Sequence, residues 1–238
     1  MHLLAGELIK VRTTRTALGF GLAAVLLTLA NVLITILATD PTTVEDKRTA
    51  LNFGGLLAIV LLVYGAVGAT GEYRHRTHAP AVLIAPDRVR LIFARMGAYG
   101  LSAAVFGVAM GIVSFGLGLA LLANAAGADL KAGDYVGLAT GGLLAAMLCT
   151  VLGVAVGTLL RSQVGTVVGV LVWLFILEPL VGLIDEDLIK YTVGISSGAL
   201  GAGGNDDASM ATGALVLVTW TAVLAAAGAL ADRRRDVD

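Results

Sequence analysis

Long apolar segments alternate with short polar ones along the chain, and this alternation predicts its elements. Six apolar segments are long enough to cross a membrane, because about 20 helical residues at 1.5 Å each traverse a hydrocarbon layer of about 30 Å. They comprise residues 17–39, 50–70, 96–123, 135–160, 164–184 and 209–231. The pattern therefore predicts six transmembrane helices, and no soluble domain fits between them. The whole chain, 1–238, is expected to form a single transmembrane domain.

The composition agrees with this pattern. Hydrophobic residues make up 58% of the chain and charged residues 14%, whereas soluble domains average about 45–50% apolar and about 25% charged residues. The first apolar segment exceeds the roughly 7–15 residues of a signal-peptide core, so we expect it to be a retained helix. The single cysteine, Cys149, lies in the fourth segment and indicates no disulfide framework. The expected class is an all-α membrane protein.

The distribution of basic residues predicts the orientation. If both termini lie inside, the four basic residues outside are Lys47, Arg48, Lys131 and Lys190. The basic residues inside are then Lys10, Arg12, Arg15, Arg74, Arg76, Arg88, Arg90, Arg95, Arg161, Arg233, Arg234 and Arg235. Basic residues concentrate in the cytoplasmic loops of membrane proteins. Both termini are therefore expected in the cytoplasm.

Residues 2–16, ahead of the first span, are only moderately hydrophobic. On a helical wheel Leu4 and Leu8 share one side, while Glu7 and Lys10 lie on the other. A short amphipathic helix in the cytoplasmic membrane interface is the favoured interpretation. A frayed basic tail is the alternative.

Polar residues within the spans are few. Thr28, Asn31 and Thr35 are spaced i, i+3 and i+7, which places them on one face of the first span. This face is expected to point into the bundle or across a subunit interface, either in a helix–helix hydrogen bond or in contact with a substrate. Glu178 and Pro179 interrupt the fifth span and predict a bend near the outer leaflet. The segment after them is expected to re-enter the membrane in part.

Three patterns bear on catalysis, and none supports it. Residues 194–198 match G-x-S-x-G, but no α/β sheet surrounds them, and His2, His75 and His78 are predicted on the opposite side of the membrane. His75 and His78 are spaced i, i+3, yet no further Cys or His lies nearby to complete a metal site. No lysine follows a glycine, so the chain has no P-loop. We therefore expect no catalytic residue, no metal and no ATP hydrolysis by this chain alone.

The segment 71–95 is the most charged part of the chain between two spans. Gly71 is expected to end the second span, and Pro86 is expected to separate two short elements. One interpretation is a short helix on the membrane surface that offers its charges to a soluble protein. The other is a solvated basic loop that only fixes the topology.

Three stretches of the sequence resemble a known family. They are ELIKVRTTRT at residues 7–16, GEYRHRTHAPAVLIAPDRVRLIFAR at 71–95 and LEPLVGLI at 177–184. They are similar to permease subunits of the ABC-2 type, the membrane components of bacterial ABC exporters. The resemblance extends over the whole chain. It implies a type V exporter-like fold with six transmembrane helices, an N-terminal interfacial helix and a cytoplasmic coupling helix.

The resemblance also implies roles for individual residues. The coupling helix would dock on the ATPase subunit through Glu72, Tyr73, Arg74, Arg76, Thr77, Pro86 and Arg88. Glu178 and Pro179 would belong to an outer gate, and Thr28, Asn31 and Thr35 would line the substrate cavity. One departure concerns residues 191–208, where the family would have a Leu-Pro pair and a small-residue helix after Tyr191, and this chain has Thr192-Val193-Gly194.

The implied partners are two ATP-binding subunits, a second permease chain and membrane lipid, with no nucleic acid. This chain would carry no cofactor, and ATP and Mg²⁺ would bind to the ATPase subunit. The implied location is the bacterial cell membrane, and the substrate would be amphipathic: a drug, antibiotic, peptide or lipid. A self-contained secondary transporter or channel is one alternative, although the spans are almost free of the charges that couple ions. An accessory membrane protein of an efflux or immunity system is another.

Overall fold

The computed structural model of the chain describes residues 2–74, 88–123, 127, 129–185, 187–205 and 208–234, and within these ranges it contains helices and no strand. Five helical segments are long and apolar enough to cross a membrane, namely Arg15–Thr39, Val89–Leu122, Ala132–Leu160, Gln163–Ile184 and Met210–Ala231. The prediction of an all-helical fold is thus confirmed for the described residues, and the five long apolar helices are compatible with a membrane protein.

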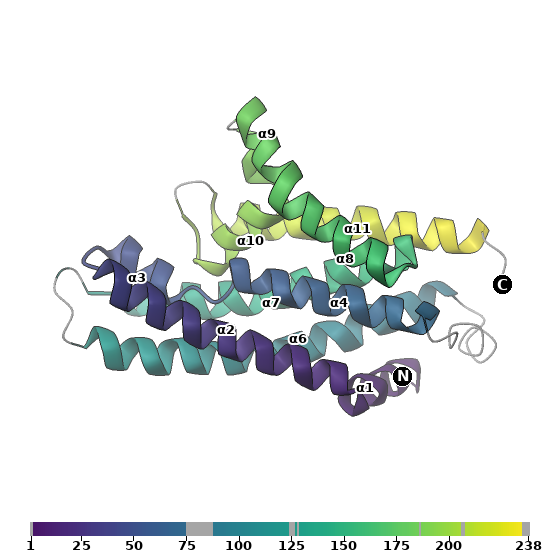
Figure 1. Cartoon of the computed structure of the whole chain (residues 1–238), viewed down its shortest axis with the longest axis horizontal. Helices are drawn as coiled ribbons and strands as arrows, with labels where there is room; N and C mark the ends of the chain where they lie inside the picture. Colours follow the sequence, from purple (N-terminus) through teal and green to yellow (C-terminus); the bar gives the residue numbers. More distant parts are fainter. Residues whose placement is uncertain are drawn as a thin grey trace.

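The longer helices run roughly along one axis of the molecule (Figure 1). The described helices, long and short, are α1 (His2–Thr13), α2 (Arg15–Thr39), α3 (Val44–Leu51), α4 (Leu56–Arg74), α6 (Arg88–Leu122), α7 (Ala132–Leu160), α8 (Gln163–Val172), α9 (Glu178–Ile184), α10 (Val193–Gly201) and α11 (Met210–Arg234), with a π-turn at Trp173–Leu177 and a 3₁₀ turn at Ile189–Tyr191. Helix α1, the starts of α2 and α6 and the ends of α4, α7 and α11 share one end, here called the terminal end. Helix α3 lies at the opposite end.

Helix α7 is the central helix. It packs against α4, α6 and α11, and 56% of its most apolar stretch is buried, against 17–28% for the other long helices. Glycines allow its close approach to α4: a Cβ on Gly153 would lie 1.9 Å from the carbonyl oxygen of Leu62, and a Cβ on Gly65 would lie 2.0 Å from that of Thr150. The backbones of the two helices therefore meet directly, as small residues permit in membrane bundles.

The second predicted span, 50–70, begins later than expected. Its first residues belong to α3, and the side chain of Asn52 accepts hydrogen bonds from the backbone N–H groups of Gly54 (2.8 Å) and Gly55 (3.2 Å). This local turn competes with helix formation, so α4 begins only at Leu56. The apolar stretch recognised within α4, Ala58–Gly71, is shorter than a full span.

At the terminal end two helices extend beyond the spans predicted from hydropathy. Helix α4 continues through Gly71 to Arg74, and a Cβ at Gly71 would meet nothing within 4 Å, so no turn requires this glycine. Helix α6 begins at Arg88, eight residues before the predicted span at 96. Arginine is a good helix former, so the helix extends beyond its apolar part. Hydropathy marks the membrane boundary there, and not the helix boundary.

The fifth predicted span is not broken at Glu178 and Pro179. Helices α8 and α9 are joined by the π-turn Trp173–Leu177, in which the N–H of Glu178 donates to the carbonyl of Trp173, five residues earlier. A proline ring clashes with the carbonyl four residues before it in a regular α-helix, and the wider π-turn provides room. The resulting rod of α8 and α9 leaves the bundle obliquely (Figure 1).

Candidate functional site

The terminal end carries the two ends of the predicted docking segment. Among the predicted docking residues, Glu72, Tyr73 and Arg74 form the last turn of α4, and Arg88 is the first residue of α6. Their side chains are not among those described, and Arg76, Thr77 and Pro86 lie outside the described residues. The structure thus places both ends of the segment at the terminal end, where the start of α6 packs against α1 (Figure 1).

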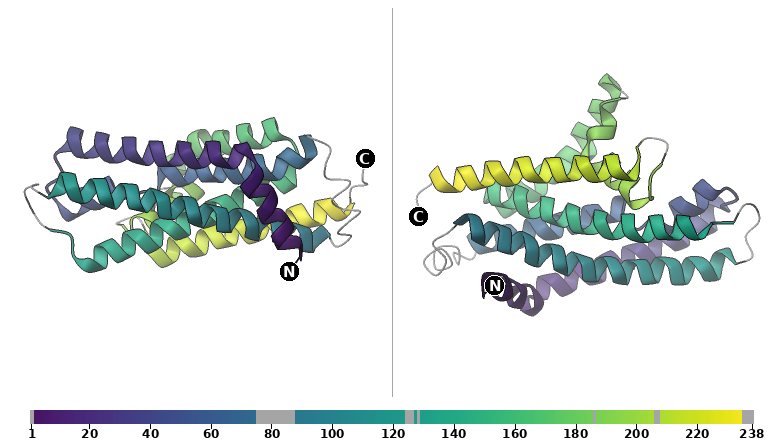
Figure 2. Two further views of the ribbon diagram at one scale, coloured as in Figure 1. Left: turned by 90° about the horizontal axis from the view of Figure 1, so that it is seen from below. Right: turned by 180° about the vertical axis from the view of Figure 1, so that it is seen from behind.

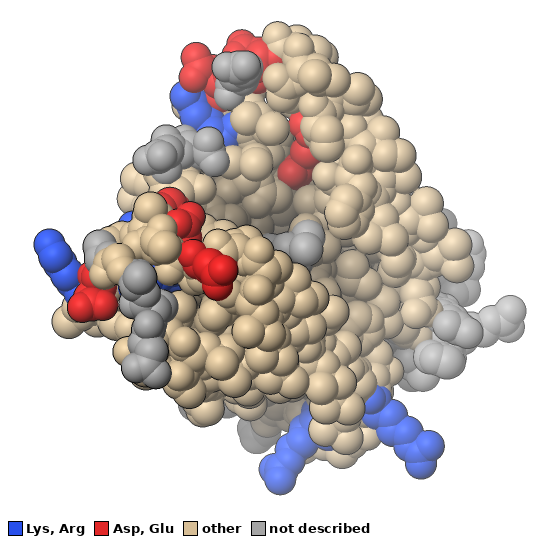
Figure 3. Space-filling view, turned by 60° about the vertical axis from the view of Figure 1, so that its left-hand side comes forward, with Lys and Arg blue, Asp and Glu red and all other residues tan. Residues whose placement is uncertain are grey.

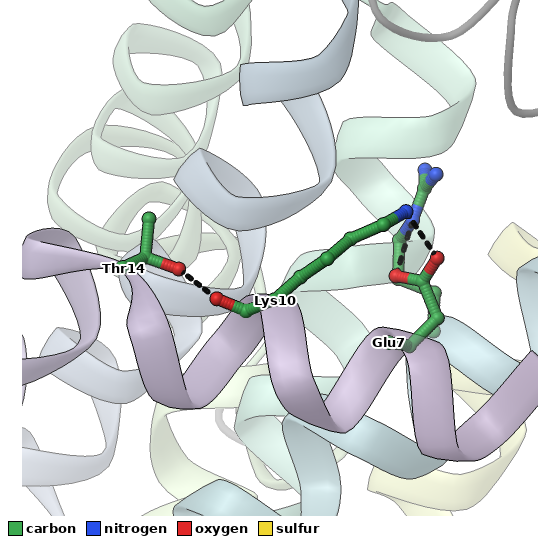
Figure 4. Close-up of polar contacts among 4 residues, drawn as sticks. Glu7, Lys10 and Thr14 are labelled. Carbon is green, nitrogen blue, oxygen red and sulfur yellow. Dashed lines mark hydrogen bonds and ion pairs between the residues drawn. The ribbon is translucent and has the colours of Figure 1, made fainter.

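Helix α1 turns away from α2 and crosses the start of α6 (Figure 2). An ionic cluster of Glu7, Lys10 and Arg95, here called the α1–α6 cluster, lies at this crossing. Lys10 Nζ donates a hydrogen bond of 2.6 Å to Glu7 Oε1, and Arg95 Nε lies 3.9 Å from Glu7 Oε2. Figure 4 shows the Lys10 side chain reaching back to Glu7, and the hydroxyl of Thr14 donating to the Lys10 carbonyl where α1 ends.

The burial of this cluster corrects the predicted orientation of α1. Glu7 retains only 4% of its accessible surface and Arg95 only 2%, whereas the Lys10 side chain is 52% exposed. Glu7 was expected on the polar, solvent-facing side of α1, and it faces α6 instead. A buried carboxylate requires a compensating charge, and Arg95 provides one from a position 88 residues away in sequence.

Glu178 forms a second buried polar centre, in the half of the molecule away from the termini. It is 5% exposed, and its carboxylate accepts hydrogen bonds from Trp173 Nε1 (2.9 Å) and from the backbone N–H groups of Val193 (3.0 Å) and Gly194 (2.9 Å). The π-turn makes the first contact possible. Residues five apart in a regular α-helix point about 140° away from each other, whereas i→i+5 bonding brings them onto a similar side.

The contacts of Glu178 cap the short helix α10. Thr192 precedes the helix, but its hydroxyl donates to the carbonyl of Ile189 and makes no capping bond. The carboxylate of Glu178 takes this role from another element. A negative charge is favourable at a helix N-terminus, where backbone N–H groups are otherwise unpaired. Glu178 therefore fastens α10 to the rod of α8 and α9.

Helix α10 is buried against α7 and α11. A small-residue helix thus follows the position at which the sequence departs from the family pattern. Ser196 donates to the carbonyl of Lys190 and Ser197 to that of Gly194, each at 2.9 Å, and both side chains are almost fully buried. The G-x-S-x-G match is accordingly part of a packed helix with its hydroxyls bonded to backbone.

Ion pairs also occur at the end opposite the termini. Lys47 is 3% exposed and lies 4.0 Å from Asp129, and Arg48 pairs with Asp134 at the start of α7. Figure 3, which brings this end forward, shows groups of acidic side chains on a surface whose other described residues are mostly uncharged.

Hydrogen bonds lower the pKa values of two exposed carboxyl groups, Asp46 and Asp187. The side chain of Thr43 and its backbone N–H, which donates to the carboxylate in the capping box, hold the pKa of Asp46 below its usual value. The hydrogen bond from Lys190 likewise lowers the pKa of Asp187, and Asp187 raises the pKa of Lys190 in turn.

No protein-family model matches this chain, and no curated protein matches its sequence. Its function must therefore be inferred from its own residues and geometry. Among the described residues, no group of three or more His, Cys, Asp or Glu side chains is placed to hold a metal ion.

The predicted cavity residues of α2 are not equivalent. Thr28 is fully buried and its hydroxyl donates to the carbonyl of Ala24 at 2.9 Å. Asn31 and Thr35 are half-buried beside the contact face of α2. The one predicted face is thus divided between a packed position and two positions that remain accessible from the surface of this chain.

Sequence reasoning missed the most buried ionic residues. The sequence offered one sign of the ion pair between Glu7 and Arg95. Glu7 is the only acidic residue before the first span, where several basic residues surround it. Lys47 gave none, because a lysine in an acidic loop normally faces water. Glu178 was recognised as a costly buried residue, but its partners, the indole of Trp173 and the backbone N–H groups of Val193 and Gly194, were not predicted from the sequence.

Proposed function

We propose that this chain is the permease subunit of an ATP-driven exporter of the ABC-2 type. Two permease chains would form the path for an amphipathic substrate, and two ATP-binding subunits would drive it. Helix α4 would complete a set of six membrane spans, with both termini in the cytoplasm of a bacterial cell. This chain would hold no cofactor, since ATP and Mg²⁺ would bind to the ATPase subunits.

The observation that carries the proposal is the α1–α6 cluster. It ties α1 to the base of α6, one of the two helices from which the docking segment extends. A force on that segment would therefore reach α6 directly and α2 through α1. Such a connection would let a separate ATPase move the membrane helices, and a separate ATPase would be needed because the chain has no P-loop of its own.

The ends of the helices support the proposed orientation. Described basic residues at the terminal end include Lys10, Arg12, Arg15, Arg90, Arg95 and Arg161. The opposite end carries Lys47, Arg48 and Lys131 together with Asp40, Glu45, Asp46, Asp129 and Asp134, and the tip of the rod of α8 and α9 carries Lys190 with Asp185 and Asp187. Such an asymmetry is typical of a cytoplasmic and an external face.

The exposed apolar surface of the oblique rod of α8 and α9 supports the proposal of a second permease chain. Its tip exposes Leu183 (83%) and Ile184 (82%) beyond the bundle, where they have few neighbours in this chain. A second copy would cover this apolar surface and enclose a path next to Asn31 and Thr35. Glu178 would hold α10 at the outer part of that path.

The docking proposal is tested by charge reversal. The double variant Glu72→Lys/Arg76→Glu is expected to reduce co-purification with the ATPase encoded by an adjacent reading frame, because it inverts the charges offered to the partner. The matched control is Glu45→Lys/Lys131→Glu, which makes the same charge changes at exposed positions of the opposite end. Complex formation is measured by affinity co-purification, and coupling by ATP-driven transport in proteoliposomes.

Normal assembly and transport in the docking variant would contradict the proposal. Transport by the purified chain alone, driven by an ion gradient, would instead identify a secondary transporter.

A further inference from the structure

A groove of about 930 Å³ follows the face formed by α6, α7 and α11, the face turned to the viewer in the right-hand panel of Figure 2. Its lining includes Phe93, Gly97 and Gly100 of α6, Leu148 of α7, and Ala222 and Ala226 of α11. Thr221 is the lone polar lining residue, and its hydroxyl oxygen is buried. The groove therefore presents hydrocarbon to whatever occupies it.

The length of the groove matches one leaflet of a bilayer. Its lining extends from Val89 to Leu101 on α6 and from Val218 to Leu230 on α11. Twelve residue steps at 1.5 Å give about 18 Å along each helix, slightly more than half of a hydrocarbon core of about 30 Å. The groove is therefore long enough to hold the acyl chains of a lipid whose headgroup lies at the terminal end.

A basic residue, Arg90, lies on α6 next to the first lining residue of the groove, Val89. Arg90 is exposed and is spaced i, i+3 and i+7 with Phe93 and Gly97, so it lies on the groove-facing side of α6. Across the groove, α11 continues beyond Leu230 to Arg234, so both helices reach the terminal end of the groove. Basic sites between helices at the cytoplasmic side of a membrane attract anionic lipid headgroups.

We propose that this groove binds an anionic phospholipid of the leaflet at the terminal end. Its acyl chains lie along the small residues of α6 and α11, and its phosphate is held at the entrance by Arg90. The groove is built within one chain, away from the oblique rod, so the proposal does not depend on the exporter function. A bound lipid would bridge α6 and α11, joining the start of one helix to the end of the other.

The acyl-chain part of the proposal is tested by filling the groove. Ala222 and Ala226 are exposed lining residues, and Ala222→Phe/Ala226→Phe would occupy the acyl positions. The control, Ala38→Phe/Ala120→Phe, alters two exposed alanines of α2 and α6 outside the groove. Native mass spectrometry of the full chain in detergent, with phosphatidylglycerol or phosphatidylcholine of identical acyl chains, is the measurement.

We expect the wild-type chain and the control to retain one phosphatidylglycerol, and the filled variant to lose it. Equal lipid retention by the filled and control variants would overturn the proposal. Loss of self-association with unchanged lipid binding would also overturn it, in favour of a second copy of the chain in the groove. Ala222→Leu is a smaller change and should lose only part of the bound phosphatidylglycerol. Size-exclusion elution of this variant checks that it is folded.

The headgroup part is tested at Arg90. One basic residue near the surface contributes on the order of a fivefold preference for an anionic lipid, so Arg90→Gln should reduce the phosphatidylglycerol preference by about that factor while phosphatidylcholine binding persists. Arg12→Gln, at an exposed position of α1 at the same end, should leave the preference unchanged. An unchanged preference in Arg90→Gln would overturn the assignment of an anionic headgroup to this entrance.

Discussion

Replacing Glu178 with alanine is expected to destabilise the protein by about 3 kcal/mol, because it removes the acceptor of a charged hydrogen-bond network. Trp173 Nε1 and the backbone N–H groups of Val193 and Gly194 would lose their partner in a buried region. Water cannot easily replace it, and the first turn of α10 would be uncapped. For a chain of this size, the expected decrease in Tm is on the order of 10 °C.

Intrinsic fluorescence suits this measurement, because the two tryptophans of the chain, Trp173 and Trp220, lie in contact close to α10. Thermal unfolding in detergent is followed by their emission. Glu178→Gln should lose less stability than Glu178→Ala, since its carbonyl oxygen can still accept from Trp173 and Val193. The control is Glu45→Ala, which removes an exposed carboxylate from α3. Equal Tm values for Glu178→Ala and this control would show that Glu178 does not fasten α10.

Hydropathy predicted the parts of the fold that the membrane determines. The five long apolar helices are determined by composition over some 20 residues each, so no knowledge of their neighbours is needed. The start of α4 depends on something smaller, the hydrogen bonds of Asn52 to Gly54 and Gly55. Hydropathy averaged over many residues does not detect a single side chain that competes with helix formation.

The candidate site was less predictable, because its contacts join distant parts of the chain. Glu178 was recognised as costly in a membrane, yet the sequence did not reveal that the N-terminus of α10 would satisfy it. The π-turn that turns Trp173 toward Glu178 has no sequence signature other than the nearby Pro179. Similarly, the helical wheel of α1 separated apolar from polar residues. It could not show that Glu7, on the polar side, would be buried against Arg95 of α6.

Arg95→Met is expected to cost about 3 kcal/mol, the lower end of the range for removing one member of a buried ion pair, because Lys10 still pairs with Glu7. Methionine can fill part of the volume of the arginine side chain, but Glu7 would remain buried without the charge that α6 supplies. Lys10→Met should cost much less, because the Lys10 side chain is 52% exposed and its contact with Glu7 is local to α1. The free energy of unfolding in denaturant is the measurement for both variants.

The double variant Glu7→Leu/Arg95→Met separates a lost charge balance from lost packing. Replacing a whole buried ion pair with apolar residues of similar volume is often neutral, so this variant should recover most of the stability that Arg95→Met loses. The apolar contacts around the cluster, including Leu8, Val11 and Tyr64, would still hold α1 in place. If the double variant lost as much unfolding free energy as Glu7→Leu and Arg95→Met together, the two side chains would not be coupled. The cluster would then not be the connection between α1 and α6 on which the proposed transmission of force depends.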